Sequence, residues 1–254
     1  MATVNSINNT IGNNDFSVNR STAGTAVESS TEHSDNTNTS SHARLLAQVG
    51  GASGGDPYLY LNVLSGQDYS FGIDNSDSDA LKIQDDADPS TGNNLWKMTS
   101  AGERTMPLQP AFIGVLSGNV VNVTGNGTQY QIGSTQAFTE IEDQGGDFNT
   151  NGTFTAPVDG IYYLSSACIL TTVTGTAVNF YCVTSNRTMV TSAKSGTAVK
   201  NNSGACGQQY SLLAEMDAAD TATTEIRDTG AGADTEGVSH GNNNGTYFTG
   251  NLVV

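Results

Sequence analysis

The sequence predicts an all-β protein, with a polar N-terminal arm and a small β-sandwich followed by a jelly roll or a related sandwich. Only 36% of the residues are hydrophobic and 13% are charged, and Gly, Ser, Thr and Asn, which favour turns and strands over helices, fill much of the rest. Short alternating segments recur between turn signals. No window sustains the three-and-four apolar spacing of an amphipathic helix. Many short strands with Gly-rich corners are typical of such sandwiches.

Residues 1–42 form the polar arm, which is dominated by Asn, Ser and Thr. Its apolar residues are too sparse to offset the entropy lost on ordering, so it has no core of its own. Two interpretations stay open, a disordered tail and an arm that becomes ordered against a partner. The alternation in Asp15–Asn19 favours the ordered arm.

Residues 43–106 are interpreted as a small β-domain, an antiparallel sheet or sandwich. Glycine-rich and aspartate-rich turn signals at 50–57 and 74–79 separate its segments. Two of the five prolines, Pro107 and Pro110, predict a linker at 105–110. The apolar alternation begins at Leu45, Ala47 and Val49 and continues in strands at 58–63, 69–73 and 80–83.

Residues 107–254 carry strand patterns up to the end of the sequence and are interpreted as the second, larger β-domain. The expected strands are 112–116, 129–132, 154–156, 161–170, 177–184, 209–215, 223–228 and 247–254.

A formal charge of -16, from 9 basic and 25 acidic residues, argues against nucleic acid and anionic membranes as partners. The opening residues have neither a basic nor an apolar signal region, and no run is long enough to span a bilayer. We therefore expect no secretion and no membrane association. The acidity itself is interpreted as a solubility device, with cation binding as the alternative.

The chemistry-bearing residues do not form an enzyme motif, and we expect no catalytic residues. Nothing matches a nucleophile elbow, a phosphate loop or a zinc-protease helix, and the three histidines are scattered. Asp74, Asp77 and Asp79 are calcium candidates by residue type, but their spacing fails the EF-hand pattern, so a solvated turn is favoured and no cofactor is expected. Cys168, Cys182 and Cys206 lack zinc spacing; we interpret them as small buried apolar residues, with a Cys168–Cys182 bridge as the alternative.

One segment, Thr153–Leu164 (TFTAPVDGIYYL), resembles the signature of the globular C1q domain in the C1q and tumour-necrosis-factor superfamily. Matching lead-in and closing segments extend the resemblance over about half of the chain, at 138–141, 145–149, 212–221 and 244–254. In physical terms Pro157 restricts the backbone, Gly160 permits a tight turn, and Tyr162 and Leu164 alternate onto one face. Leu164, Ser166 and Ala219 depart from the family pattern, so no ligand site is carried over.

The resemblance implies a C1q/TNF-like jelly roll that assembles as a homotrimer. It makes Tyr162, Tyr247 and Phe248 candidates for subunit contacts, and ordinary core packing inside one subunit is the alternative for each. Polar loop residues that could contact a host glycan or protein are Asn201, Asn202, Asn242 and Asn243, and the alternative is that they are simply solvated.

The first half is similar to a module of phage fibre and virion surface proteins, through residues 35–37, 41–45, 48–51 and 71–79. The predicted function is therefore a structural protein on the virion surface of a tailed phage, a fibre or capsid decoration. The first β-domain would attach to capsid or tail proteins, and the C1q-like domain would adhere to the host surface. A capsid cement protein without a host ligand and a fibre-borne depolymerase are the two alternatives.

Overall fold

The computed structural model describes residues 32–34, 36–194, 200–241 and 245–254. The chain divides into two units, residues 1–53 and residues 54–254. In the described residues of the first unit there is no strand, so the strand expected at Leu45, Ala47 and Val49 is wrong. The strand expected at Asp15–Asn19 lies outside the described residues.

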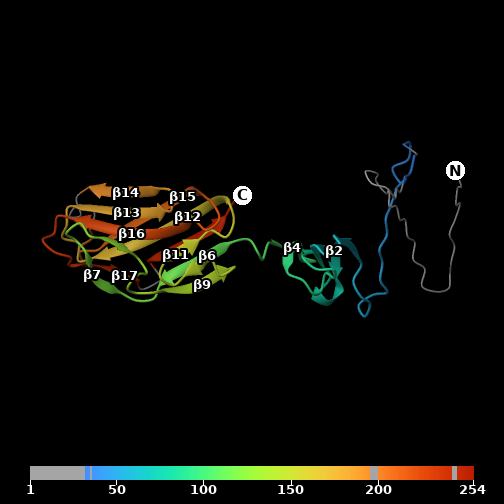
Figure 1. The fold of residues 1–254 in the computed structure, drawn as a ribbon, viewed down its shortest axis with the longest axis horizontal. Coiled ribbons are helices and arrows are strands. Elements are labelled where there is room, and N and C mark those ends of the chain that lie inside the picture. The colour runs from blue at the N-terminus through green and yellow to red at the C-terminus, as the bar shows by residue number, and fades with distance from the viewer. Residues whose placement is uncertain (1–31, 35, 195–199, 242–244) are drawn as a thin grey trace. The chain divides into compact units, whose positions relative to one another are not determined.

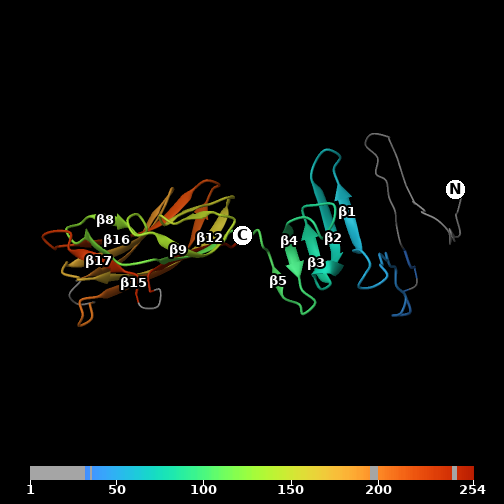
Figure 2. The same cartoon turned by 90° about the horizontal axis from the view of Figure 1, so that it is seen from below.

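The second unit begins with a single five-stranded antiparallel sheet, in which each strand pairs with the next along the chain (Figure 2). Of the antiparallel sheet and the sandwich that the sequence left open for this region, the structure has the sheet. A short 3-10 turn, η1 (Asn75–Asp77), connects the second and third strands. The strands are β1 (Tyr58–Asn62), β2 (Asp68–Asp74), β3 (Ala80–Gln84), β4 (Asn94–Met98) and β5 (Arg104–Thr105).

The remaining strands form two antiparallel sheets that pack as a jelly roll (Figure 1). The first sheet has the order β7-β17-β12-β18-β6-β9, with β15 on the other side of β12, and the second has the order β10-β11-β16-β13-β14, with β8 beside β16. The strands are β6 (Ala111–Leu116), β7 (Val120–Thr124), β8 (Gln129–Gln131), β9 (Phe138–Gln144), β10 (Phe148–Asn149), β11 (Thr153–Thr155), β12 (Gly160–Thr171), β13 (Ala177–Thr184), β14 (Thr188–Lys194), β15 (Cys206–Met216), β16 (Thr221–Thr229), β17 (Glu236–Ser239) and β18 (Tyr247–Leu252).

An aromatic cluster fills the space between the two sheets. The ring of Phe112 stacks on Phe148 and Phe154 at centroid distances of 4.6 and 4.8 Å and meets the edge of Phe248 at 5.0 Å. Gly114 lies directly under the Phe148 ring, where a Cβ would come within 2.5 Å of that ring, so a larger residue would displace the cluster. Aromatic rings in offset and edge contacts supply most of the burial in such a core.

The predicted fold class, all-β with a C-terminal jelly roll, is confirmed by these sheets. One detail of the signature segment differs from its interpretation. Gly160 does not have the positive φ of a tight turn. A Cβ there would lie 2.7 Å from the carbonyl oxygen of Val254, so glycine is needed for the close approach of the chain end.

Candidate interaction surfaces

The two predicted contact residues Tyr162 and Phe248 lie in the core of one subunit. Both side chains are 0% exposed, and the Tyr162 ring lies 5.3 Å from that of Phe154 while its hydroxyl donates to the Val158 carbonyl at 2.8 Å. Neither can offer surface to another subunit. Core packing, the alternative that the sequence left open, is therefore the outcome for both, whereas Tyr247 is half-buried on the opposite face of its strand.

Alternation along β12 turns the neighbouring residue outward. Tyr163 is 39% exposed, and residues directly opposite it in the antiparallel ladder share its face. The outer β12 face consists of Tyr163, Leu213 and Asn251 in one row, Ser165, Ser211 and Thr249 in the next, Ala167, Gln209 and Tyr247 in the third, and Ile113 and Val115 on β6.

A depression of about 350 Å³ lies in the middle of the outer β12 face, and Tyr163, Ser165, Gln209, Ser211 and Tyr247 contribute to its lining. Two tyrosines around a hydroxyl-lined depression combine apolar area with hydrogen-bonding groups. This combination is typical of the anchor positions of protein interfaces.

Three of the four strands that carry this face contain no charge. β6, β12 and β18 have no Asp, Glu, Lys or Arg, and β15 has only Glu215, which is exposed and lies 3.3 Å from Arg187. The whole chain carries a formal charge of -16, and the nearest acidic residues on this side of the sheet are on the flanking strands, with Glu142 on β9 opposite Ile113 and Glu215 on β15 opposite Ile161. Acidic subunits can approach one another through the three uncharged strands with little like-charge repulsion.

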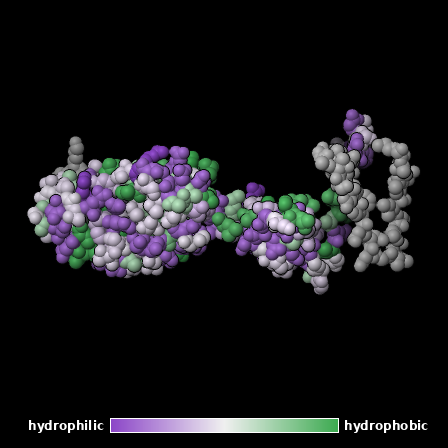
Figure 3. Space-filling view, in the orientation of Figure 1, coloured by the Kyte–Doolittle hydropathy of each residue, from purple (hydrophilic) through white to green (hydrophobic). Residues whose placement is uncertain are grey.

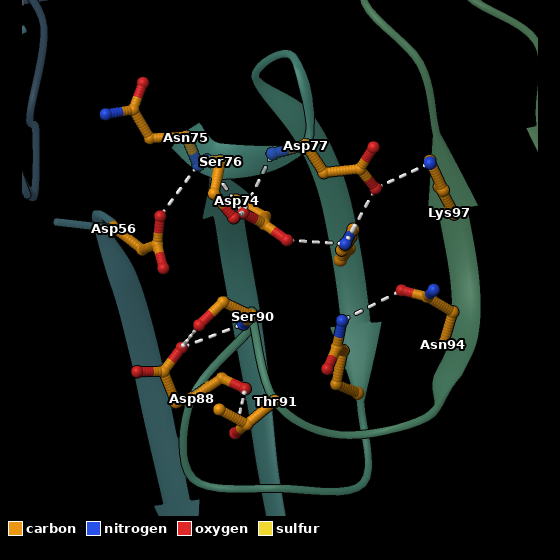
Figure 4. Close-up of polar contacts among 12 residues, drawn as sticks. Asp56, Asp74, Asn75, Ser76, Asp77, Asp88, Ser90, Thr91, Asn94 and Lys97 are labelled. Carbon is orange, nitrogen blue, oxygen red and sulfur yellow. Dashed lines mark hydrogen bonds and ion pairs between the residues drawn. The ribbon is translucent and has the colours of Figure 1, made fainter. Parts of the chain in front are cut away.

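Two of the three calcium candidates, Asp74 and Asp77, form ion pairs with lysines, and the third, Asp79, is exposed. Lys82 Nζ lies 2.6 Å from Asp74 Oδ2 and 2.8 Å from Asp77 Oδ2, and Lys97 Nζ lies 2.6 Å from the same Asp77 oxygen (Figure 4). The Lys82 and Asp74 side chains are only 6% and 3% exposed. In the described residues no group of three or more His, Cys, Asp or Glu side chains could hold a metal ion.

Hydrogen bonds set the protonation of this cluster. Burial alone would raise the pKa of Asp74, but hydrogen bonds from Lys82 and Ser76 outweigh it and lower that pKa. The pKa of Asp77 is lowered by its hydrogen bonds to Lys82 and Lys97. Burial opposes the charge on Lys82, yet its bonds to the two carboxylates raise its pKa. The cluster thus holds its charges at neutral pH and contributes stability there.

A second pair of buried acids lies in the jelly roll. Asp228 and Glu236 are both 0% exposed, and Glu236 Oε1 accepts hydrogen bonds from the backbone N–H groups of Thr174 (2.7 Å) and Gly175 (2.9 Å). Burial raises the pKa of Glu236, and the neighbouring Asp228 carboxyl acts in the same direction. A carboxyl group that keeps its proton can donate to its neighbour, which explains how two acids are buried together.

All three cysteines are free and buried, so the Cys168–Cys182 bridge is not formed and the apolar interpretation is confirmed. Burial raises the pKa of Cys168 strongly and that of Cys182 to about 11. Thiols in this state are poor nucleophiles because the thiolate is the reactive form.

The predicted ligand loops are placed only in part. Asn201 is used within its own turn, where its side-chain oxygen accepts from the N–H groups of Ser203 and Ala205 at 2.9 and 3.0 Å. Asn202 is exposed, and Asn242 and Asn243 lie outside the described residues. A ligand role for these loops stays a prediction.

Comparison with known proteins found solved structures that are similar to this chain at low sequence identity. No family model matches the chain, and no curated protein matches it. Similar solved structures include murine APRIL at pH 8.5 (13% identity, TM-score 0.39, covering 57% of this chain and 99% of that one). The globular domain of zebrafish complement 1qA protein is also similar, with 18% identity and a TM-score of 0.37, over 57% of this chain and 98% of that one. PRD1 vertex protein P5 has 12% identity and a TM-score of 0.41, over 58% of this chain and 99% of that one. The fold assignment rests on the strand order given above.

No helix in the described part of the chain has the length and apolar character needed to span a membrane.

Sequence reasoning missed Tyr163, because adjacent tyrosines in β12 fit either phase of the alternation. The signal that could have identified the outer β12 face is the complete absence of charge from β6, β12 and β18.

Proposed function

We propose that this chain is a homotrimeric structural protein on the virion surface of a tailed phage, a fibre or capsid decoration that displays its jelly roll for adhesion to the host. The observation that carries the trimer is that β6, β12 and β18, the central strands of the outer β12 face, contain no charged residue on a chain with a formal charge of -16. A monomer would have no reason to exclude charge from three neighbouring strands on their solvent side. An interface requires it, because a charge buried there without a partner is costly.

The contact residues in this proposal are Tyr163, Tyr247 and Leu213. They replace Tyr162 and Phe248, whose side chains are used inside the subunit. Tyrosine is enriched at interface anchor positions because its ring supplies area and its hydroxyl can be satisfied by a partner.

The virion context is supported by the resemblance of the first half of the chain to a module of phage fibre and virion surface proteins. In this proposal the first β-domain attaches to capsid or tail proteins and three jelly rolls face outward. Three copies on one attachment point raise the effective concentration of any weak site, so adhesion does not need one strong pocket.

Gold-labelled antibody against residues 107–254, applied to purified particles of the virus that encodes the chain, tests the proposal. Label on tail or head appendages is the expected result. Label over the whole capsid lattice would instead identify a cement protein, and particles without label would contradict a virion role altogether. Sedimentation of the purified chain tests the trimer independently, and a mass of three times 26.3 kDa is expected.

A further inference from the structure

The five-stranded sheet presents an apolar face to solvent. Cross-strand partners share a face, so the register places β1 to β4 side chains together in rows. Leu59 pairs with Phe71, which pairs with Ile83, which pairs with Trp96. The apolar sheet face consists of Leu59, Leu61, Tyr69, Phe71, Ile73, Leu81, Ile83, Trp96 and Met98.

This face is exposed within one subunit. Six of its side chains, those of β1 and β2 together with Ile83, are 37% to 53% exposed. Figure 3 shows hydrophobic side chains at the surface of this part of the chain. At the size of such side chains, the uncovered apolar surface is on the order of 500 Å², which is more than half of the ~800 Å² that each partner covers in a stable interface.

The sheet buries its polar face and exposes its apolar face, the reverse of the usual arrangement. The residues that alternate with the apolar ones are Ser70, Asp74, Lys82 and Gln84, and all four are buried. Of residues 54–106, all of which the structure describes, Ala80 is the one hydrophobic residue that is buried. A small sheet needs an apolar face packed against something to be stable. In this sheet the ion-paired residues Asp74 and Lys82 are buried, and the apolar residues of the opposite face are exposed.

We infer that the apolar sheet face is covered by the same face of other copies of this chain, so that three sheets pack around a three-fold axis. This inference rests on the proposed homotrimer. The sheet has almost no core of its own, so the surface that covers it must be available for every copy of the chain at the time it folds. Another copy of the chain meets that condition. The nine side chains of the face are all uncharged, and the one charged residue paired with them, Arg104 opposite Met98, lies at the β5 edge. Obligate homo-oligomeric interfaces are correspondingly apolar.

Site-specific thiol labelling tests the inference on the full chain. The three native cysteines are buried, so an introduced one is the accessible thiol. Phe71→Cys (46% exposed in the subunit) reports on the apolar sheet face. Tyr60→Cys (45% exposed) is its matched control, because Tyr60 pairs with Ser70 and lies on the other face. N-ethylmaleimide is the probe, since an uncharged reagent is not repelled by the acidic chain.

The expected result is that Phe71→Cys reacts about tenfold or more slowly than Tyr60→Cys in the native assembly, and that both react equally fast in denaturant. Ile83→Cys, on the same face, should repeat the protection if Phe71→Cys does not fold, as judged by circular dichroism. The mass of each variant is measured by sedimentation in the same buffer.

Mass and labelling together separate the possible failures. Fast labelling of Phe71→Cys and Ile83→Cys in a trimer would overturn this inference and leave the proposed trimer intact. Fast labelling in a monomer would overturn both. Protection in a monomer would show that the chain covers its own sheet, which would also overturn the assignment to a second copy.

Discussion

Two neighbouring tyrosines in β12 should respond in opposite ways to substitution. Tyr162 is 0% exposed and its hydroxyl is bonded to the Val158 carbonyl, so Tyr162→Ala removes a core ring. That change should cost about 3–5 kcal/mol, with about 1 kcal/mol more for the lost hydrogen bond. A domain has only ~5–15 kcal/mol of stability, so the variant should unfold or remain marginally folded.

Tyr163→Asp should leave the subunit folded and separate the trimer. The side chain is 39% exposed in one subunit, so the change within the subunit should be about 1 kcal/mol or less. In the assembly the new carboxylate would be desolvated on a face without a cation, at a cost of several kcal/mol. Because that penalty recurs in each copy, we expect monomers at micromolar concentration.

Sedimentation equilibrium and urea unfolding distinguish the two outcomes. Val121→Asp is the matched control and should remain trimeric, since Val121 is exposed on β7, which ends this sheet and is separated from β12 by β17, and is not among the residues of the outer β12 face. A trimeric Tyr163→Asp protein would refute the role of the outer β12 face. A Tyr162→Ala protein as stable as the wild type would refute the assignment of that ring to the core.

Three further predictions follow from the buried charges and thiols. Lys82→Met should lower the free energy of unfolding by about 3–5 kcal/mol at pH 7, because it leaves the buried Asp74 carboxylate unpaired. The pKa of Asp74 is lowered in the folded state, so the difference between variant and wild type should shrink below about pH 4, as measured by urea titrations. The raised pKa of Glu236 contributes stability that is present at low pH and lost as the pH rises through it. Glu236→Gln should therefore have a higher Tm than the wild type at pH 7, with no such advantage near pH 4; an unchanged difference across this range would contradict the account. Cys182 and the other native thiols should react with N-ethylmaleimide only in denaturant, and rapid labelling of the native protein would show that they are accessible.

The strands of the jelly roll core were predictable because their apolar residues alternate with polar ones over a long stretch. Strand β12 is an example, expected at 161–170 and observed at Gly160–Thr171. Strands β4, β5, β7, β9, β10, β14 and β17 were not predicted, and β9 and β14 show why. The sequence of β9, FTEIEDQ, is mostly polar, and β9 and β14 each lie at the end of a sheet path, so they pair with only one neighbour in it.

The face that each strand buries was harder to predict than the strand itself. Tyr162 and Tyr163 are both aromatic, so residue type could not decide which one turns inward. In β2 the apolar residues Tyr69, Phe71 and Ile73 alternate correctly, but they face outward because the ion pairs of Asp74 occupy the other side. The buried side of β2 can be assigned only when the positions of the polar partners of Asp74 are known, and those positions depend on the tertiary structure.

The central claim is that the outer β12 face and the apolar sheet face of this acidic chain are covered by other copies of the same chain. Sedimentation equilibrium of the purified full chain, from high to low micromolar concentration, tests it most directly. The account predicts a single species of three times 26.3 kDa. A species of 26.3 kDa throughout that range would contradict it.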